Sequence, residues 1–486
     1  MTREIEPQHH ASLRDYEGVA HLARAVRELR HEAEALLPRM RGRRVWMVNS
    51  TAQGGGVAEL LPPLVGLLRE LDFDARWLVM ESEDPSFFRL TKRLHNMIHG
   101  EGSADLAADE RSLYERCGRL AADEIGGQVA DGDLLIVHDP QPLAAGAALR
   151  RERDIAAVWR CHIGLDRENP ATVAAWDFLE PWARAYDHAV FTAAEYIPRC
   201  LSGKASVLYP SIDPLSDKNR ELPVHRLTAI LAGGGLVRAG APVADPPFSA
   251  VAQRLQADGS WAVATEPDDI GLLFRPIVCQ VSRWDRLKGY LPLLQGFAAL
   301  KRRIGDDAPR TLQLARLVLA GPDPAFIADD PEGREALDEL CAAYRGLAPA
   351  LQEDVAVLTL PMESREENAL LVNALQRCSD VVVQNSLREG FGLTATEAMW
   401  KRIAVVGSSA VGLRQQIRDG LDGCLVRNPQ DPEEIARTLG ALLADPVRRE
   451  ALGLSAQQRV HDDFLIFAHL RRWLKVMGDT VASRWD

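Results

Sequence analysis

Two glutamates lie eight residues apart in a glycine-rich segment of the second half of the chain. Glu389 precedes a Gly-Phe-Gly-Leu sequence and Glu397 follows it. If a helix begins near Leu393 or Thr394, Glu397 lies on its first turn and Glu389 stays in the preceding loop. Glycines let the backbone approach a ligand, and the free N–H groups of a helix start favour a diphosphate. The carboxylates would suit sugar hydroxyls; a simple turn and a helix-dipole role are the alternatives.

Two cations follow an apolar run about a hundred residues earlier. Arg283 and Lys288 come shortly after residues 276–280, the first strand expected in the second half of the chain. Loops at such strand ends are where open α/β sheets bind ligands. The arginine could neutralise a diphosphate through its fork geometry and the lysine as a compact charge. The alternative is a pair of solvated cations in a surface loop.

Polar side chains also follow two apolar runs in the first half of the chain. His138 and Asp139 come after one run, and Arg160 and His162 come after the next. Because parallel strands end at the same edge of a sheet, these four side chains could surround a polyol. A purely structural role is the alternative for each histidine.

A glycine loop and one helix face supply weaker candidates. Gly55 and Gly56 precede a helical pattern and could place backbone donors against phosphate or acceptor oxygens. Their spacing differs from the Gly-x-Gly-x-x-Gly of nicotinamide dehydrogenases, and a tight turn is the alternative. Lys92 and Asn96 could reach an acceptor, although a solvated helix face explains them equally well.

Short apolar runs alternate with helix-length segments along the whole chain. The runs are residues 45–48, 75–80, 134–137, 156–159, 189–191 and 207–208, then 276–280, 317–320, 355–358, 381–383 and 404–406. This alternation predicts an α/β fold with two doubly wound, Rossmann-like domains and mainly parallel sheets. We expect residues 1–213 to form the first domain and residues 276–462 the second. The Pro- and Gly-rich residues 214–275 suggest a linker or insertion.

Composition excludes several functional classes. The formal charge of −12 over 486 residues argues against nucleic-acid binding. Seven scattered cysteines, without metal-ligand spacing, favour a reducing compartment, and neither an apolar signal core nor a membrane-length apolar stretch occurs. The cytoplasm is therefore expected, with no membrane partner. The nucleophile elbow, Walker loop and HExxH signatures of other enzyme classes are absent.

The ordered set of motifs resembles the retaining glycosyltransferases of the GT-B fold. Their second domain carries an Arg-x4-Lys pair and a Glu-x7-Glu motif, which here are Arg283/Lys288 and Glu389/Glu397. The trehalose glycosyltransferring synthases are the closer likeness. The segments similar to theirs are residues 49–51, 54–59, 138–142, 159–162, 210–215, 280–283 and 384–393. Residues 214–275 depart from the family's usual connection.

This resemblance implies two domains facing a central cleft, with a C-terminal helix, residues 463–486, returning to the first domain. It implies a nucleotide diphosphate glucose donor with the base undetermined (UDP, ADP or GDP), and no required cofactor or metal. The expected catalytic residues are His162, Glu389, Arg283 and Lys288. The expected donor-binding residues are Gly55, Gly56, Arg283, Lys288, Asn385, Glu389, Gly390, Phe391, Gly392, Leu393 and Glu397, and the expected acceptor-binding residues are Lys92, Asn96, His138, Asp139 and Arg160.

The activity implied by the resemblance is transfer of glucose to glucose, reversibly forming α,α-trehalose. A trehalose phosphorylase, which could use the same cationic pocket for inorganic phosphate, remains an alternative. So does a glucosyl- or mannosyltransferase acting on another polyol or glycan. A sugar-nucleotide sensor without turnover is the non-enzymatic alternative. The oligomeric state stays open, with a homodimer as one possibility.

Overall fold

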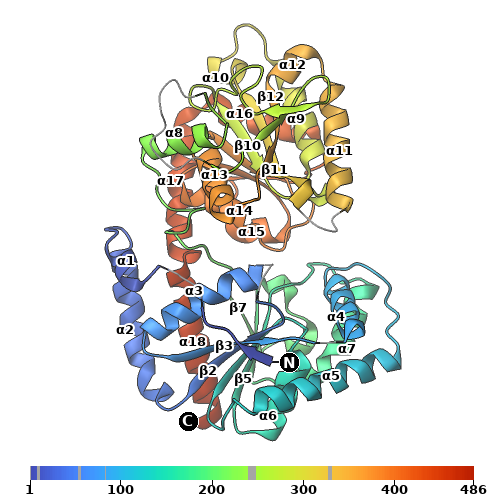
Figure 1. The fold of residues 1–486 in the computed structure, drawn as a ribbon, viewed down its shortest axis with the longest axis vertical. Coiled ribbons are helices and arrows are strands. Elements are labelled where there is room, and N and C mark those ends of the chain that lie inside the picture. Colours follow the sequence, from blue (N-terminus) through green and yellow to red (C-terminus); the bar gives the residue numbers. More distant parts are fainter. Residues whose placement is uncertain (1, 8–10, 53–55, 83, 239–247, 327–330) are drawn as a thin grey trace. The chain divides into compact units, whose positions relative to one another are not determined.

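A computed structural model describes residues 2–7, 11–52, 56–82, 84–238, 248–326 and 331–486. The chain divides into two compact units, Met1–Ser211 with Leu465–Asp486, and Ile212–Phe464. Each unit contains one sheet with helices on both of its faces (Figure 1). This confirms the prediction of two doubly wound α/β domains.

The sheet of the first unit has seven strands in the order β1-β3-β2-β4-β5-β6-β7, and only the edge strand β1 is antiparallel to its neighbour. The strands are β1 (Thr2–Glu4), β2 (Arg44–Asn49), β3 (Asp74–Met80), β4 (Leu134–His138), β5 (Ala156–Cys161), β6 (His188–Phe191) and β7 (Ala205–Val207). The helices are α1 (Leu13–Glu17), α2 (Ala23–Met40), α3 (Gly56–Glu70), α4 (Pro85–Ile98), α5 (Ala108–Gly126), α6 (Leu143–Glu152), α7 (Pro170–Ala183) and α18 (Ile466–Trp485). Because helices cover both faces of this sheet, its parallel strands are nearly continuous apolar runs.

The C-terminal helix α18 packs beside α2 in the first unit (Figure 1). Its apolar stripe is buried there: Phe467, Leu470, Leu474 and Met477. Arg471 of α18 pairs with Glu28 at 3.3 Å and with Glu32 at 2.5 Å on α2. The last helix of the chain is thus built into the unit that contains the first strand.

The sheet of the second unit has eight strands in the order β15-β14-β13-β10-β11-β12-β8-β9. The strands are β8 (Gln253–Leu255), β9 (Trp261–Val263), β10 (Ile277–Val281), β11 (Arg316–Pro322), β12 (Val355–Leu360), β13 (Val381–Gln384), β14 (Ala404–Ser408) and β15 (Cys424–Val426). The helices are α8 (Val224–Gly233), α9 (Tyr290–Arg303), α10 (Arg310–Gln313), α11 (Pro331–Arg345), α12 (Pro349–Glu353), α13 (Arg365–Arg377), α14 (Leu393–Trp400), α15 (Val411–Gln416), α16 (Pro432–Ala444) and α17 (Pro446–Asp463). Six strands are parallel, β8 is antiparallel to β12, and β9 is antiparallel to β8.

The described part of residues 214–275 belongs to the second unit. It contributes α8, which packs on α13, and the strands β8 and β9. The composition of this segment suggested a linker or insertion. Its two strands were not recognised in the sequence, because strands of three residues carry little periodic signal.

Adjacent residues along the strands of the second sheet pack into two separate hydrophobic cores. Val278 and Leu317 pack on one face with α9 and α16, whereas Cys279 and Val318 pack on the other face with α8 and α13. Since side chains alternate along a strand, a strand covered on both faces must be apolar throughout. The polar residues that follow each strand are therefore gathered at its end.

Candidate active site

The cationic loop of the second unit begins where β10 ends. Asp285 accepts a hydrogen bond from the backbone of a short 3-10 turn whose last residue is Lys288. Gln280 Nε2 donates to the Lys288 carbonyl at 2.8 Å. Gly289, the N-cap residue of α9, has φ 65°. A Cβ on it would lie 2.1 Å from the Asn385 carbonyl oxygen. Only glycine fits this close approach, which fixes where the lysine side chain emerges.

Lys288 and Glu389 form an ion pair, Nζ to Oε2, of 2.7 Å. Ser386 Oγ donates to the same oxygen at 2.9 Å, and Gln384 Nε2 lies 3.3 Å from it. The side chains of the pair are 16% and 11% exposed, so each charge is partly withdrawn from water and neutralised by the other. The sequence predicted both residues separately. Ser386 and Gln384 had no assigned role, and their position directly after a strand was the signal.

The glycine loop after Glu389 ends at a residue with a left-handed backbone conformation. Gly392 has φ 87° and precedes α14, and it has no side chain with which to cap the helix. Gln416 Nε2 donates to the Phe391 carbonyl and, at 3.3 Å, to the Gly392 carbonyl. Thr396 in turn donates to Gln416. The loop is thus held through its carbonyls.

Glu397 lies in the second turn of α14, because the helix begins at Leu393. The expectation of a first-turn position was therefore wrong, since Glu397 is the fifth residue of the helix. Lys401, four residues later, donates to the Glu397 carbonyl at 3.1 Å and to Gln376 Oε1 at 2.7 Å. Burial lowers the pKa of Lys401 to about 7, and the carboxylate of Glu397 opposes this shift. Sequence reasoning missed Lys401, whose spacing from Glu397 was the available signal.

The remaining predicted residues of this unit differ in exposure. Asn385 is buried, and its Nδ2 donates to the carbonyls of Gly289 at 3.1 Å and Pro429 at 2.9 Å. Its side chain therefore ties the segment after β13 to the cationic loop and to the loop that follows β15. Arg283 is exposed. Phe391 is buried, with its ring edge-on to Phe464 at 5.7 Å between centroids.

In the first unit, the ends of β4 and β5 bring together the four predicted polar residues. Asp139 has φ 63°, its N–H donates to the Arg160 carbonyl at 2.7 Å, and its Oδ1 accepts from the His162 N–H at 2.9 Å. His138 Nδ1 lies 3.1 Å from His162 Nε2, and the two rings are nearly parallel. A left-handed aspartate held by neighbouring strands is a feature of functional sites.

Burial shifts the charges of this cluster. It lowers the pKa of His138 to about 3 and that of His162 well below its ordinary value, and the nearby Arg160 lowers both further. Burial also raises the pKa of Asp139 to about 6. Both histidines are therefore neutral at physiological pH, and the aspartate titrates close to neutrality.

Arg160 is fully buried behind the histidines. Its NH2 group donates to the Leu208 carbonyl at 2.8 Å and to Thr192 Oγ1 at 3.2 Å. Its Nε and NH1 find no hydrogen-bond partner among the described residues. Burial lowers the pKa of this guanidinium to about 10, so it stays charged at neutral pH.

Two residues of α18 complete the cluster, and sequence reasoning missed both. His469 Nδ1 lies 2.8 Å from the Tyr209 carbonyl, and Trp473 donates to His469 Nε2 at 3.0 Å. The Trp473 ring also packs 6.4 Å from the His138 ring. His469 interrupts the apolar stripe of its helix, which was the only local signal.

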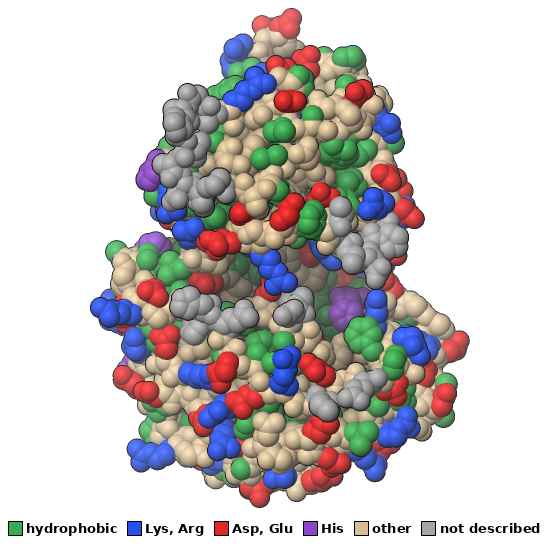
Figure 2. Space-filling view, in the orientation of Figure 1, with side chains coloured by type: hydrophobic (Ala, Val, Ile, Leu, Met, Phe, Trp, Pro, Cys, Tyr) green, Lys and Arg blue, Asp and Glu red, His purple; other side chains and the backbone are tan. Residues whose placement is uncertain are grey.

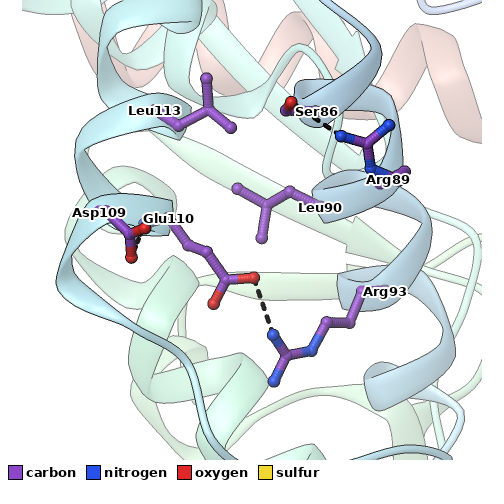
Figure 3. Close-up of a pocket in the computed structure, with 7 residues that line it drawn as sticks. All are labelled: Ser86, Arg89, Leu90, Arg93, Asp109, Glu110 and Leu113. Atoms are coloured by element: carbon purple, nitrogen blue, oxygen red, sulfur yellow. Dashed lines mark hydrogen bonds and ion pairs between the residues drawn. The ribbon is translucent and has the colours of Figure 1, made fainter.

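The weaker candidates stand apart from this cluster. Lys92 and Asn96 lie on the exposed side of α4. A pocket of about 260 Å³ lies between α4 and α5, and neither residue lines it. Figure 3 shows Leu90 and Leu113 across this pocket, with Arg93 paired to Glu110 at 2.7 Å. Gly56 begins α3, and Gly55 lies outside the described residues.

Two further properties concern metal ions and the surface. Within the described ranges, no group of three or more His, Cys, Asp or Glu side chains could hold a metal ion. No helix in that part of the chain is long and apolar enough to cross a membrane. Figure 2 shows acidic and basic side chains interspersed over the visible face of each unit.

The second unit brings together a cation, a carboxylate and a helix start. The ammonium of Lys288 and the start of α14 favour phosphate oxygens, and the carboxylate of Glu389 accepts from hydroxyls. The fold matches a solved α,α-trehalose-phosphate synthase (UDP-forming) from Burkholderia vietnamiensis with a TM-score of 0.64, at 17% identity over 91% of this chain and 98% of that one. Residues 271–459 match the family "Glycosyl transferases group 1". The protein is a GT-B glycosyltransferase, of the class that transfers a hexose from a nucleotide sugar.

The family follows from the first unit and from full-length relatives. Residues 47–198 match the family "Trehalose synthase, N-terminal domain". A trehalose synthase of Pyrococcus horikoshii is 35% identical over 93% of both chains, and one of Rubrobacter xylanophilus is 32% identical over 98% of this chain and all of its own. A trehalose phosphorylase of Grifola frondosa is more distant, at 24% identity over 89% of this chain and 56% of its own. The chain belongs to the trehalose synthase family.

Proposed function

We propose that the protein transfers glucose from a nucleotide diphosphate glucose to the anomeric hydroxyl of a second glucose, reversibly forming α,α-trehalose. The observation that carries the proposal is the Lys288–Glu389 pair beside the glycine loop and the start of α14. It joins a cation for the diphosphate to a carboxylate for sugar hydroxyls within one unit. The similarity to trehalose synthases supports the choice of sugars.

The donor is assigned to the second unit. Arg283 and Lys288 bind the diphosphate, and Glu389 binds hydroxyls of the transferred glucose. Glu397 binds the ribose. The backbone of residues 390–393 completes this site, with Asn385 joining the segment after β13 to the cationic loop. Gly55 and Gly56 of the first unit remain proposed donor-binding residues.

The acceptor is assigned to the first unit. Asp139 is half-buried at the sheet edge and is proposed to contact acceptor hydroxyls, whereas the half-buried His162 is proposed to contact the transferred sugar. His138 and Arg160 are enclosed behind them, so we assign these two a supporting role in place of direct acceptor contact. Lys92 and Asn96 on the exposed side of α4 remain proposed acceptor residues.

The proposed reaction keeps the configuration of the transferred glucose. The bond between its C1 and the diphosphate oxygen breaks, and a bond from the acceptor oxygen to C1 forms on the same face. The acceptor proton moves to the departing phosphate. Arg283 and Lys288 stabilise the developing negative charge, and His162 donates a hydrogen bond to the transferred sugar. Positioning and charge stabilisation supply the acceleration.

The deciding experiment uses purified, metal-stripped protein with glucose and UDP-, ADP- or GDP-glucose. Chromatography measures disaccharide and released nucleotide, and proton NMR reports the anomeric linkage. α,α-Trehalose formed in proportion to nucleoside diphosphate is the expected result. Trehalose cleavage that requires inorganic phosphate would instead establish a phosphorylase. Transfer only to another polyol, or nucleotide-sugar binding without turnover, would also refute the proposal.

We also propose that the enzyme works in the cytoplasm without a cofactor or a metal ion. The seven cysteines are all free thiols, as expected in a reducing compartment. Full activity after chelation, unchanged by added Mg²⁺ or Mn²⁺, is the expected outcome in the same assay.

A further inference from the structure

The His138 and His162 rings are joined by one hydrogen bond. His138 Nδ1 and His162 Nε2 are 3.1 Å apart, so one of the two nitrogens donates and the other accepts. Burial and the charge of Arg160 lower the pKa of both imidazoles, which keeps both rings neutral. Each ring therefore carries one N–H, and the position of the shared hydrogen sets the tautomer of both residues.

The two possible arrangements differ at the far nitrogen of His138. This atom, Nε2, is buried and has no hydrogen-bond partner among the described residues. If His162 donated, His138 Nε2 would carry a buried hydrogen with no acceptor. If His138 donates through Nδ1, its Nε2 is a bare lone pair.

The second arrangement is favoured because it leaves no buried donor unpaired at His138 Nε2. The groups whose charges influence His138 are the guanidinium of Arg160 and the imidazole of His469. An unpaired buried donor is disfavoured strongly enough to shift such an equilibrium by about tenfold.

We propose that His138 is a positioning residue that holds His162 as its Nδ1–H tautomer. His162 then presents a hydrogen-bond donor at Nδ1, the nitrogen that does not face His138. A donor at this point suits a sugar hydroxyl oxygen, or an oxygen that gains negative charge during transfer. The consequence for catalysis rests on the proposed glucosyl transfer, whereas the tautomer itself does not. Trp473 and His469 of α18 pack behind His138.

The tautomer can be measured without substrate on the full-length enzyme. Long-range proton–nitrogen NMR of ¹⁵N-histidine-labelled protein distinguishes a protonated ring nitrogen from a bare one, and loss of signals in His162→Asn assigns the residue. We expect a protonated Nδ1 and a bare Nε2 for His162. A protonated Nε2 in the wild type would overturn the proposal, whatever the enzyme transfers.

Three variants separate this role from mere packing. His138→Phe keeps a ring without the hydrogen bond and should move His162 toward its Nε2–H tautomer. His138→Asn can still donate from Nδ2 and should retain the Nδ1–H form. His188→Phe alters a half-buried histidine of β6 that bonds Ser206, and should leave the His162 signals unchanged.

Kinetics then tests the consequence. kcat/KM should fall about tenfold in His138→Phe and recover largely in His138→Asn. A tautomer change without a rate change would refute the link to catalysis. An intact tautomer in an enzyme that makes no trehalose would refute only the proposed function.

Discussion

At the scale of single residues, the site of the second unit depends on charges that neutralise each other. Lys288 and Glu389 are 101 positions apart in the chain, yet they form one ion pair whose carboxylate also accepts from Ser386. Removing one partner of such a pair leaves the charge of the other partly buried and without a counter-charge. Arg283, by contrast, is exposed, so its contribution should concern ligands and not the fold.

Substitution of the two cations tests this difference. Lys288→Ala should lower the free energy of unfolding by about 1–3 kcal/mol, because Glu389 loses its counter-charge. Arg283→Ala should leave the denaturant midpoint unchanged. Both should weaken binding of the nucleoside diphosphate more than binding of the nucleoside, measured by calorimetry. Equal weakening of both ligands would contradict the diphosphate assignment.

Asp139 links stability to pH with a defined sign. Burial raises its pKa from 3.8 to about 6, so the folded state holds the proton more tightly than the unfolded state does. This group's contribution to stability is therefore greatest below pH 4 and is lost as the pH rises through 6. Asp139→Asn keeps an acceptor for the His162 N–H without the charge.

The stability of the Asp139→Asn variant relative to the wild type should consequently increase as the pH rises. We expect its thermal midpoint, relative to the wild type, to increase by about 2–4 °C between pH 4.5 and pH 8, with slower turnover. Thermal melts at both pH values measure this. A constant difference between the two proteins would show that Asp139 is not a strained carboxylate.

At the scale of elements, the start of α14 depends on the backbone of the glycine loop. Gly392 adopts a left-handed conformation that side chains disfavour, and Gln416 on α15 holds the carbonyls of the loop. Glu389 lies at the other end of this short loop. A distortion of the loop should therefore displace the carboxylate that we assign to the sugar.

Two glycine substitutions separate this effect from general loss of flexibility. A Cβ at Gly392 would lie 2.9 Å from Glu389 Cγ, whereas a Cβ at Gly390 meets nothing within 4 Å. Gly392→Ala should destabilise the protein by about 1–3 kcal/mol and lower kcat/KM more than tenfold. Gly390→Ala is the matched control for stability and should unfold near the wild-type denaturant midpoint. Similar losses in both variants would point to flexibility as the cause.

At the scale of the whole molecule, the two units differ in their buried histidines. In the first unit His138 and His469 are buried and His162 is half-buried, whereas in the second unit His225 is exposed and His461 is half-buried. Burial lowers the pKa of His138 and of His469 to about 3, and that of His162 well below its ordinary value. These rings stay neutral when folded and become protonated on unfolding in acid.

The first unit should therefore lose stability first as the pH falls. The contribution of the three histidines is fully present above pH 6.5 and declines below it, by about 1.4 kcal/mol per pH unit for each ring. Hydrogen–deuterium exchange at pH 5.5 and 7.5, corrected for intrinsic rates, should show greater deprotection in peptides of the first unit. Equal deprotection in both units would contradict neutral burial of the cluster.

Local patterns in the sequence determined much of this protein. The apolar runs predicted the central strands of both sheets, since a strand covered on both faces must be apolar along its length. Residues directly after those strands supplied most candidates, because parallel strands end at one edge. The strands β1, β8, β9 and β15 were not predicted, as three residues carry too little periodicity.

Only the tertiary structure decided which candidates meet. Lys288 reaches Glu389 because β10 and β13 are hydrogen-bonded neighbours in the sheet, although a hundred residues separate them. His469 joins the histidine cluster because α18 packs on the first unit, which its apolar stripe alone could not specify. Short-range periodicity reports the burial of a residue, whereas its partner across the fold is set by strand order and helix packing.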